Sequence, residues 1–218
     1  MSERIEALIR ALRGGDGHAR ARAAQSLITL RDPQAVPLLL DTLSDDDESV
    51  RGLAARVLGE AGDARAREGL VEALNDPSSA VAKDAAAALG LLRIPGSEAG
   101  LVQALGAPHP AVRTTVAWAL GELRAADAVD ALVQALADRA GPVRSGAAKA
   151  LGEIADARAV DALIGVLADP LPEVRQTAAW ALGECKDPRA RTHLAALSSD
   201  GQPTVRRLVQ EALKKLQA

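Results

Sequence analysis

The sequence contains no Phe or Tyr, two Trp and one Cys among its 218 residues. A hydrophobic core without Phe and Tyr has to be built from Ala, Leu, Val and Ile, and these side chains suit closely packed helices. A single Cys excludes an internal disulfide and is typical of proteins in a reducing compartment. We therefore expect a helical protein that stays in the cytoplasm.

Long apolar runs and a large excess of one charge are also missing. No stretch approaches the roughly 18 uninterrupted apolar residues of a membrane span, and the charged start, Met1-Ser2-Glu3-Arg4-Ile5-Glu6, is unlike a signal peptide. The chain has 26 Lys and Arg against 29 Asp and Glu, a net charge of −3. This balance gives no sign of a surface for nucleic acid or an anionic membrane. A soluble protein with neither of these partners is expected.

What the chain does contain is a repeated stretch, which in one copy runs from Val112-Arg113 to Leu120-Gly121-Glu122. The Leu of this stretch recurs with a constant step of 31 residues. Its positions are Leu27, Leu58, Leu89, Leu120, Leu151, Leu182 and Leu213. Self-similarity at a fixed period of this length is the signature of a solenoid, in which each unit packs only on its neighbours. The sequence predicts seven copies of one unit.

Each copy has the pattern of two helices joined by a turn. Apolar residues at i, i+3, i+4 and i+7 mark the first helix, as in Val129, Leu132, Val133 and Leu136. The second helix buries a stripe that in one copy is Val143, Ala147, Leu151 and Ile154. We predict an all-α solenoid of about seven helix pairs, forming a single domain over residues 1–218. The more polar units at about 1–32 and 188–218 are predicted to cap it.

A Gly recurs near the end of the second helix, and it is followed by Glu in four copies and by Leu91 in the copy with Gly90. Its positions are Gly59, Gly90, Gly121, Gly152 and Gly183. It serves either as a small packing contact or as a relaxed final turn, and the pattern leaves both interpretations open.

The Val-Arg pairs, the Leu-Gly-Glu runs and the segment from Asp156-Ala157-Arg158 to Ala162-Leu163 together resemble a known family. They are similar to the short HEAT-like repeats of phycobilin lyase subunits, of many bacterial proteins and of designed binding solenoids. The resemblance covers almost the whole chain, and it implies a HEAT-like fold whose second helices line a concave face. It also implies that variable residues on this face carry the binding function.

No group of residues predicts catalysis or a metal site. Cys185 occupies a repeat slot that is otherwise apolar, so it is interpreted as a small buried hydrophobe. His18, His109 and His193 fall in unrelated slots and form no i, i+4 pair. We expect no catalytic residue, no metal and no cofactor, and a non-enzymatic role is favoured over an enzymatic one.

An Arg recurs at the start of the second helix, as in Arg51, Arg113, Arg144 and Arg175. Aspartates recur in the links between repeats, at Asp32, Asp63, Asp156 and Asp187. Two interpretations are possible, a phosphate-binding stripe and a ladder of ion pairs and loop caps between units. The ladder is favoured, because guanidinium groups match carboxylates and turn carbonyls in geometry.

The exposed slots of the second helices are the candidate site. Trp118 and Trp180 occupy the same slot two repeats apart, and large apolar side chains on a polar surface mark binding sites. The other predicted partner-binding residues are Thr115, Lys149, Thr177, Glu122, Glu153 and Glu184. The alternative is that each indole merely lies over the neighbouring helix. Six basic and six acidic residues in these slots cancel, which disfavours DNA binding.

These patterns favour a non-catalytic scaffold or adaptor that binds a protein or peptide through the second helices. An alternative from the enzyme class, implied by the resemblance alone, is a subunit that helps to attach or detach a bilin chromophore. A nucleic-acid-binding solenoid is the third and least favoured hypothesis. The sequence identifies neither the partner nor the oligomeric state.

Overall fold

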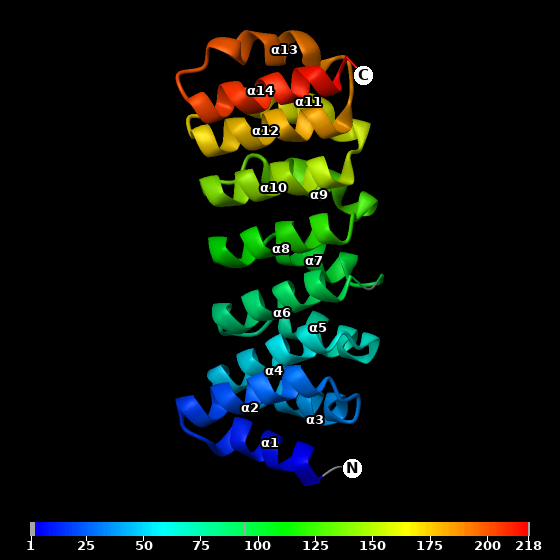
Figure 1. The fold of residues 1–218 in the computed structure, drawn as a ribbon, viewed down its shortest axis with the longest axis vertical. Coiled ribbons are helices and arrows are strands. Elements are labelled where there is room, and N and C mark those ends of the chain that lie inside the picture. Colours follow the sequence, from blue (N-terminus) through cyan, green and yellow to red (C-terminus); the bar gives the residue numbers. More distant parts are fainter. Residues whose placement is uncertain (1–2, 94, 218) are drawn as a thin grey trace. The chain divides into compact units, whose positions relative to one another are not determined.

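The computed structural model describes residues 3–93 and 95–217, and over these residues the fold consists of fourteen α-helices and five short 3-10 helices, without strands (Figure 1). The first helices of the pairs are α1 (Glu3–Gly14), α3 (Ala35–Thr42), α5 (Arg67–Ala73), α7 (Glu98–Ala104), α9 (Val129–Ala135), α11 (Val160–Gly165) and α13 (Ala190–Ala196). The second helices are α2 (Gly17–Leu30), α4 (Glu48–Ala61), α6 (Ser79–Leu92), α8 (Pro110–Glu122), α10 (Gly141–Ile154), α12 (Pro172–Cys185) and α14 (Pro203–Lys215). The 3-10 helices are η1 (Ala64–Ala66), η2 (Ala126–Ala128), η3 (Ala157–Ala159), η4 (Val166–Ala168) and η5 (Leu197–Ser199).

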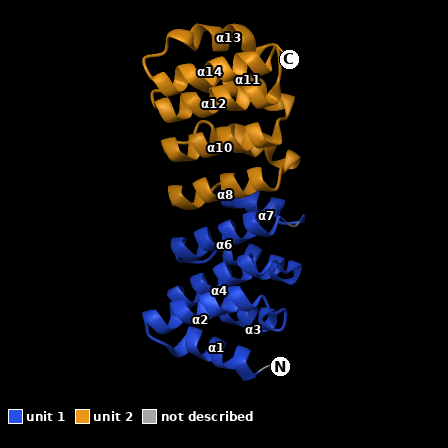
Figure 2. Cartoon of the chain, in the orientation of Figure 1, with its two compact units in different colours: residues 1–104 blue, residues 105–218 orange. Residues whose placement is uncertain are grey.

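The chain divides into two compact units, residues 1–104 and 105–218 (Figure 2). In the first unit α4 packs between α2 and α6, and in the second α10 packs between α8 and α12, with α14 beyond α12. Within each unit, first helices pack against their own second helices, as α3 does on α4, α5 on α6, α9 on α10 and α11 on α12. The predicted all-α stack of HEAT-like helix pairs is confirmed within each unit. One domain over residues 1–218, with caps at its ends, stays a prediction.

The Gly of the Leu-Gly-Glu run allows neighbouring second helices to approach closely. A Cβ added to Gly152 would lie 2.8 Å from the Cα of Ala181, and a Cβ added to Gly183 would lie 2.9 Å from the Cα of Ala212. Real Cβ atoms do not come so close to a neighbouring backbone. The left-handed residue that ends α10 is Ala155 with φ 57°, three residues after Gly152. The packing interpretation of this Gly is therefore correct, and the relaxed final turn is not.

The recurring Arg forms the expected ladder, but with a different set of aspartates. Arg144 donates from Nε and Nη2 to the two carboxylate oxygens of Asp169 at 2.7 and 2.9 Å, and from Nη1 to the carbonyl of Asp138 at 2.9 Å. Each Arg thus joins the turn of its own pair to the turn of the next pair. The equivalent pairs are Arg51–Asp76, Arg113–Asp138 and Arg175–Asp200.

The link aspartates have a separate role. Asp156 accepts the backbone N–H of Arg158 at 2.8 Å, which caps η3, and its carboxylate also binds the Arg158 side chain. Arg158 in turn donates to the carbonyl of Ala126 at 2.8 Å. The ladder aspartates lie 25 residues after their Arg, in the turn between first and second helices. Both sets of aspartates recur with the 31-residue period, so the period alone does not show which set contacts the Arg, and the stacking of the two turns decides it.

Across the described residues, no helix is long and apolar enough to cross a membrane.

Candidate functional site

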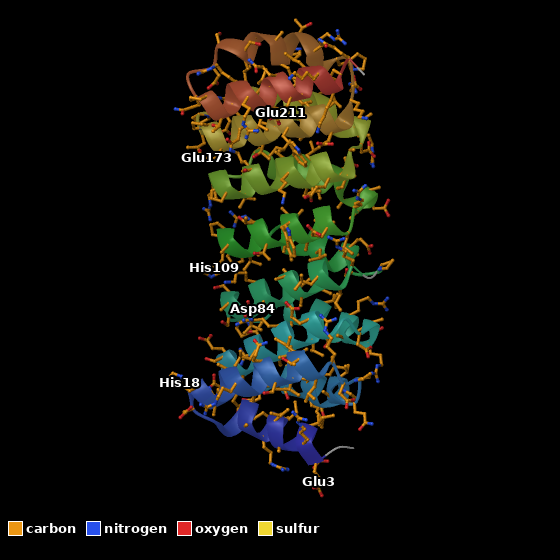
Figure 3. The ribbon with its side chains drawn as sticks, in the orientation of Figure 1. Glu3, His18, Asp84, His109, Glu173 and Glu211 are labelled. Atoms are coloured by element: carbon orange, nitrogen blue, oxygen red, sulfur yellow. The ribbon has the colours of Figure 1, made fainter. Side chains whose placement is uncertain are left out.

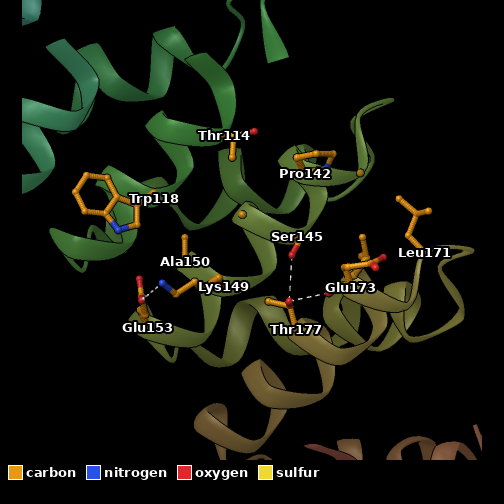
Figure 4. Close-up of a pocket in the computed structure, with 13 residues that line it drawn as sticks. Thr114, Trp118, Pro142, Ser145, Lys149, Ala150, Glu153, Leu171, Glu173 and Thr177 are labelled. Atoms are coloured by element: carbon orange, nitrogen blue, oxygen red, sulfur yellow. Dashed lines mark hydrogen bonds and ion pairs between the residues drawn. The ribbon is translucent and has the colours of Figure 1, made fainter. Parts of the chain in front are cut away.

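A hollow of about 560 Å³ opens over α10 in the second unit, between α8 and α12 (Figure 4). We call it the α10 groove. Its floor is a stripe of α10 in which the half-buried Ser145 and Gly146 lie between the buried Gly141 and Ala150. Its sides come from Thr114 and Trp118 of α8 and from Leu171, Val174 and Thr177 at and after the start of α12. Pro142, Lys149, Glu153 and Glu173 complete the lining.

The groove exists because α10 has small residues where its neighbours have larger ones. Ser145 and Gly146 stand in the slots that hold Thr114 and Thr115 in α8, and Gln176 and Thr177 in α12. The two small residues of α10 therefore leave a hollow between the larger side chains of α8 and α12. Sequence reasoning concentrated on the large side chains and missed this pair. The signal that could have identified them is a local minimum of side-chain volume between two repeats that each carry a Trp.

Apolar side chains are open to solvent at both ends of the groove. Trp118 is half-buried and lies at one end, while Leu171, 40% exposed, lies at the other (Figure 4). Pro142 is exposed beside Leu171, whose side chain covers Gly141. Removal of such apolar surface from water on binding stabilises a complex by about 25 cal/mol per Å² of buried apolar area. The groove is therefore suited to a ligand with apolar side chains.

The hydroxyl groups that line the groove already bind within the protein. Thr114 Oγ1 donates to the carbonyl of Pro110 at 2.9 Å, and Thr177 Oγ1 donates to the carbonyl of Glu173 at 2.8 Å. Ser145 Oγ lies 3.1 Å from Thr177 Oγ1, so these two hydroxyls share a hydrogen bond. A ligand in the groove finds few unused hydrogen-bond donors.

The charges around the groove are unequally partnered. Lys149 is exposed and lies 3.5 Å from Glu153, an i, i+4 pair of the weak surface type. The second oxygen of Glu153 is buried over Gly121 and accepts no hydrogen bond from any described group. Glu173 is exposed at the start of α12 (Figure 3), and its charge acts on Arg175, whose guanidinium is bound to Asp200. Lys149 and Glu173 therefore remain available to a partner.

The groove brings together four of the eight predicted partner-binding residues: Trp118, Lys149, Thr177 and Glu153. The other four lie outside its lining. Thr115 donates to the carbonyl of Ala111 at 3.0 Å, and Glu184 forms an ion pair with Lys215. Glu122 is half-buried on α8.

Trp180 differs from Trp118 although both occupy the same slot. Its Cζ3 atom would lie 2.6 Å from a Cβ added to Gly152, so the ring lies directly on α10. This is the packing role that the alternative interpretation describes. The side chain is nevertheless half-buried and not fully enclosed.

Cys185 is half-buried at the end of α12. Burial raises the pKa of its thiol to about 11, and the charges of Asp187, Asp156 and Glu184 act in the same direction. Since the thiolate is the nucleophile, a raised pKa makes a reactive role unfavourable. His18, in α2, and His109, before α8, do not form a cluster with other ligands (Figure 3), and the described residues contain no group that could hold a metal.

A second hollow, of about 390 Å³, lies on the first unit beside α4. Charges of both signs line it, including Arg20, Glu48, Arg56 and Asp84. Burial raises the pKa of Asp84, while Lys83 and Arg56 oppose the rise. Leu53 is the one large apolar side chain in its lining, which contains no aromatic residue.

Stacked helix pairs with a constant 31-residue period define an α-solenoid repeat protein. The sequence matches the family model of HEAT repeats over residues 5–90, 67–150 and 129–214. The chain therefore belongs to the HEAT repeat family. No curated protein matches the sequence significantly.

Solved structures extend this result. The complex of CpcE and CpcF of phycocyanin lyase from Nostoc sp. PCC7120 is 25% identical, with TM-score 0.61, over 97% of this chain and 94% of that chain. An archaeal HEAT-like repeats protein from Thermococcus onnurineus NA1 is 16% identical, with TM-score 0.67, over 100% and 98% of the two chains. An engineered protein is 24% identical, with TM-score 0.67, over 98% and 68%. The last two likenesses concern the fold alone.

Proposed function

We propose that this HEAT repeat protein is a non-catalytic scaffold or adaptor that binds a protein or peptide partner on the second helices of its second unit. The observation that carries the proposal is the α10 groove, a hollow with apolar side chains at both ends. Trp118 provides the kind of half-buried aromatic side chain that dominates binding energy at protein interfaces. Exposed apolar surface of this type marks an interaction site.

The test is a selection of displayed random peptides on the whole chain and on a variant with a filled groove. In Gly146→Leu the new side chain occupies the floor, since a Cβ at this position has only ordinary contacts at 3.6–3.7 Å. Gly165→Leu is the matched control, because nothing lies within 4 Å of a Cβ on Gly165 in α11. We expect peptides that bind the wild type and Gly165→Leu but bind Gly146→Leu at least about 30-fold more weakly, as for a central hot spot. Equal binding to all three proteins would remove the groove from the proposal.

Trp118→Ala provides a second variant. We expect it to weaken binding of the selected peptides by about 2 kcal/mol or more, because a central aromatic anchor is lost. Lys149, Thr177 and Glu153 are proposed as further contacts, and Thr115, Glu122, Trp180 and Glu184 as contacts of a partner that extends beyond the groove. Unchanged affinity in Trp118→Ala would contradict the central role of the indole.

A second candidate function is that of a bilin lyase-like subunit. It is favoured by the 25% identity to the phycocyanin lyase complex and by the groove volume of about 560 Å³, which falls within the ~300–1,000 Å³ typical of small-molecule sites. Titration with a free bilin tests it. Saturable change in visible absorbance, lost in Gly146→Leu and kept in Gly165→Leu, would favour this candidate over the adaptor.

A further inference from the structure

The hydrogen bonds inside the α10 groove restrict the kind of partner it can hold. The hydroxyls of Thr114, Ser145 and Thr177 are engaged with the protein itself. In these bonds Thr114 and Thr177 are donors, so few free donors remain in the groove for the C=O groups of an extended peptide. Part of such a peptide backbone would lose water without gaining replacements, and each such loss is costly. An α-helix satisfies these groups internally and brings only its side chains to the groove. The groove therefore favours a helical partner.

The dimensions of the floor agree with such a partner. The lining runs along α10 from Gly141 to Glu153, which at 1.5 Å per residue is about 18 Å, or three to four helical turns. A partner helix of this length presents apolar side chains at i, i+4, i+7 and i+11 along one face, a span of about 16 Å. These side chains would meet Trp118 at one end and Leu171 at the other, with the small Ser145 and Gly146 below its middle.

The charges at the rim define the polar residues of the partner. Glu173 corresponds to Pro142 in the 31-residue register, and Lys149 follows Pro142 by two helical turns. The exposed carboxylate and the exposed ammonium group are thus separated by about 10 Å along the helix axes. A complementary helix carries one basic and one acidic residue two turns apart, beside its apolar stripe.

We infer that the α10 groove binds an amphipathic α-helix of a partner protein, with a basic residue opposite Glu173 and an acidic residue opposite Lys149. This inference rests on the proposed binding function and specifies its partner. An extended peptide and a second copy of this chain are the competing occupants.

The experiment compares two displayed peptide libraries on the full chain. One library presents a randomised face on a helical peptide, and the other presents the same randomised positions in a peptide interrupted by prolines, which cannot form a helix. We expect binders only from the helical library, with apolar residues at i, i+4, i+7 and i+11, and loss of binding in Gly146→Leu but not in Gly165→Leu. Binders confined to the proline library would overturn the helical inference and leave the proposed function intact. Binders from neither library would contradict both.

A charge exchange then tests the rim. With the best helical binder, Glu173→Lys should weaken binding by about 5-fold or more, and replacing the basic residue of the peptide by Glu should restore it. Asp127→Lys makes the same charge change in η2, outside the groove lining, and should have no effect. Equal losses in Glu173→Lys and Asp127→Lys would overturn the assignment of charges. Self-association of the wild-type chain that Gly146→Leu abolishes would assign the groove to a second copy, and would also overturn the inference.

Discussion

Replacing Gly146 by Ala tests whether the Gly that forms the floor of the α10 groove lowers the free energy of unfolding of the protein. Gly146 lies in the interior of α10, where Gly is less favourable than Ala by about 0.5–1 kcal/mol. An added Cβ would meet Ala117 Cβ and the Thr114 carbonyl at 3.6 Å and Thr114 Cγ2 at 3.7 Å, all ordinary contacts. No neighbour has to move. We therefore expect the free energy of unfolding to rise by about 0.5–1 kcal/mol in Gly146→Ala.

Two other glycines of the second unit provide contrasts. Gly152→Ala would place a methyl group 2.8 Å from Ala181 Cα and 2.6 Å from Trp180 Cζ3, so the helices must separate. Overpacking of this kind costs about 1–3 kcal/mol. Gly165→Ala meets no neighbour within 4 Å, and it should be neutral or slightly stabilising without any effect on the groove.

The assay is urea unfolding followed by far-ultraviolet circular dichroism, with thermal melting as a second measurement. For a chain of this size the gain in Gly146→Ala corresponds to an increase in Tm of roughly 1–4 °C. Peptides selected on the groove should bind Gly146→Ala more weakly in spite of its higher stability. A loss of stability in Gly146→Ala, or a gain in Gly152→Ala, would refute this account of the floor. Higher stability of Gly146→Ala with unchanged peptide binding would show that the floor of the groove does not contact the bound peptide.

Three further results are expected. Arg144→Ala should lower the free energy of unfolding by about 1–3 kcal/mol, because the hydrogen bonds to Asp169 are largely buried. Arg158→Ala removes an exposed ion pair and should lower the free energy of unfolding by only about 0–1 kcal/mol. Equal losses of the two variants in urea unfolding would contradict this distinction. Hydrogen bonds from Arg144 hold the pKa of Asp169 below its usual value of 3.8, so this pair stabilises the fold above about pH 4, and the stabilisation is lost as the pH falls below that value. The loss of stability on acidification should therefore be smaller in Arg144→Ala than in the wild type. An identical pH profile would show that the pair does not contribute. Cys185, with a thiol pKa of about 11, should react with thiol reagents at pH 8 about 10- to 100-fold more slowly than a free thiol, and faster as the pH rises. Rapid labelling of the folded chain at neutral pH would show that the thiol is not protected.

The repeat and its helix pairs could be predicted from the sequence, because they depend on local patterns. The stripe of Val143, Ala147 and Leu151 requires helical spacing, and the 31-residue recurrence of Leu151 requires that every copy pack in the same way. The absence of Phe and Tyr indicated a core of small and aliphatic side chains, and the buried hydrophobic residues of both units are Ala, Leu, Val and Ile. These features need only the neighbouring residues along one helix.

Pairings between turns needed the tertiary structure. Arg144 and Asp169 lie 25 residues apart, a separation that is not a multiple of the repeat, and the distance between them depends on how two successive turns stack. The link aspartates such as Asp156, which caps η3, and the ladder aspartates such as Asp169 both recur with the 31-residue period, so the sequence does not show which of the two sets contacts the Arg. The geometry of a contact between non-equivalent slots cannot be read from equivalent ones.

The same reason applies to the candidate site. The sequence placed Trp118 and Trp180 in one slot and predicted one role for both. Only the structure distinguishes them, because Trp180 has Gly152 beneath its ring while Trp118 borders a hollow over Ser145 and Gly146. A large side chain is visible in a sequence, whereas a hollow is produced by what small residues leave unfilled between their neighbours. Tertiary packing therefore decided where a partner can be accommodated.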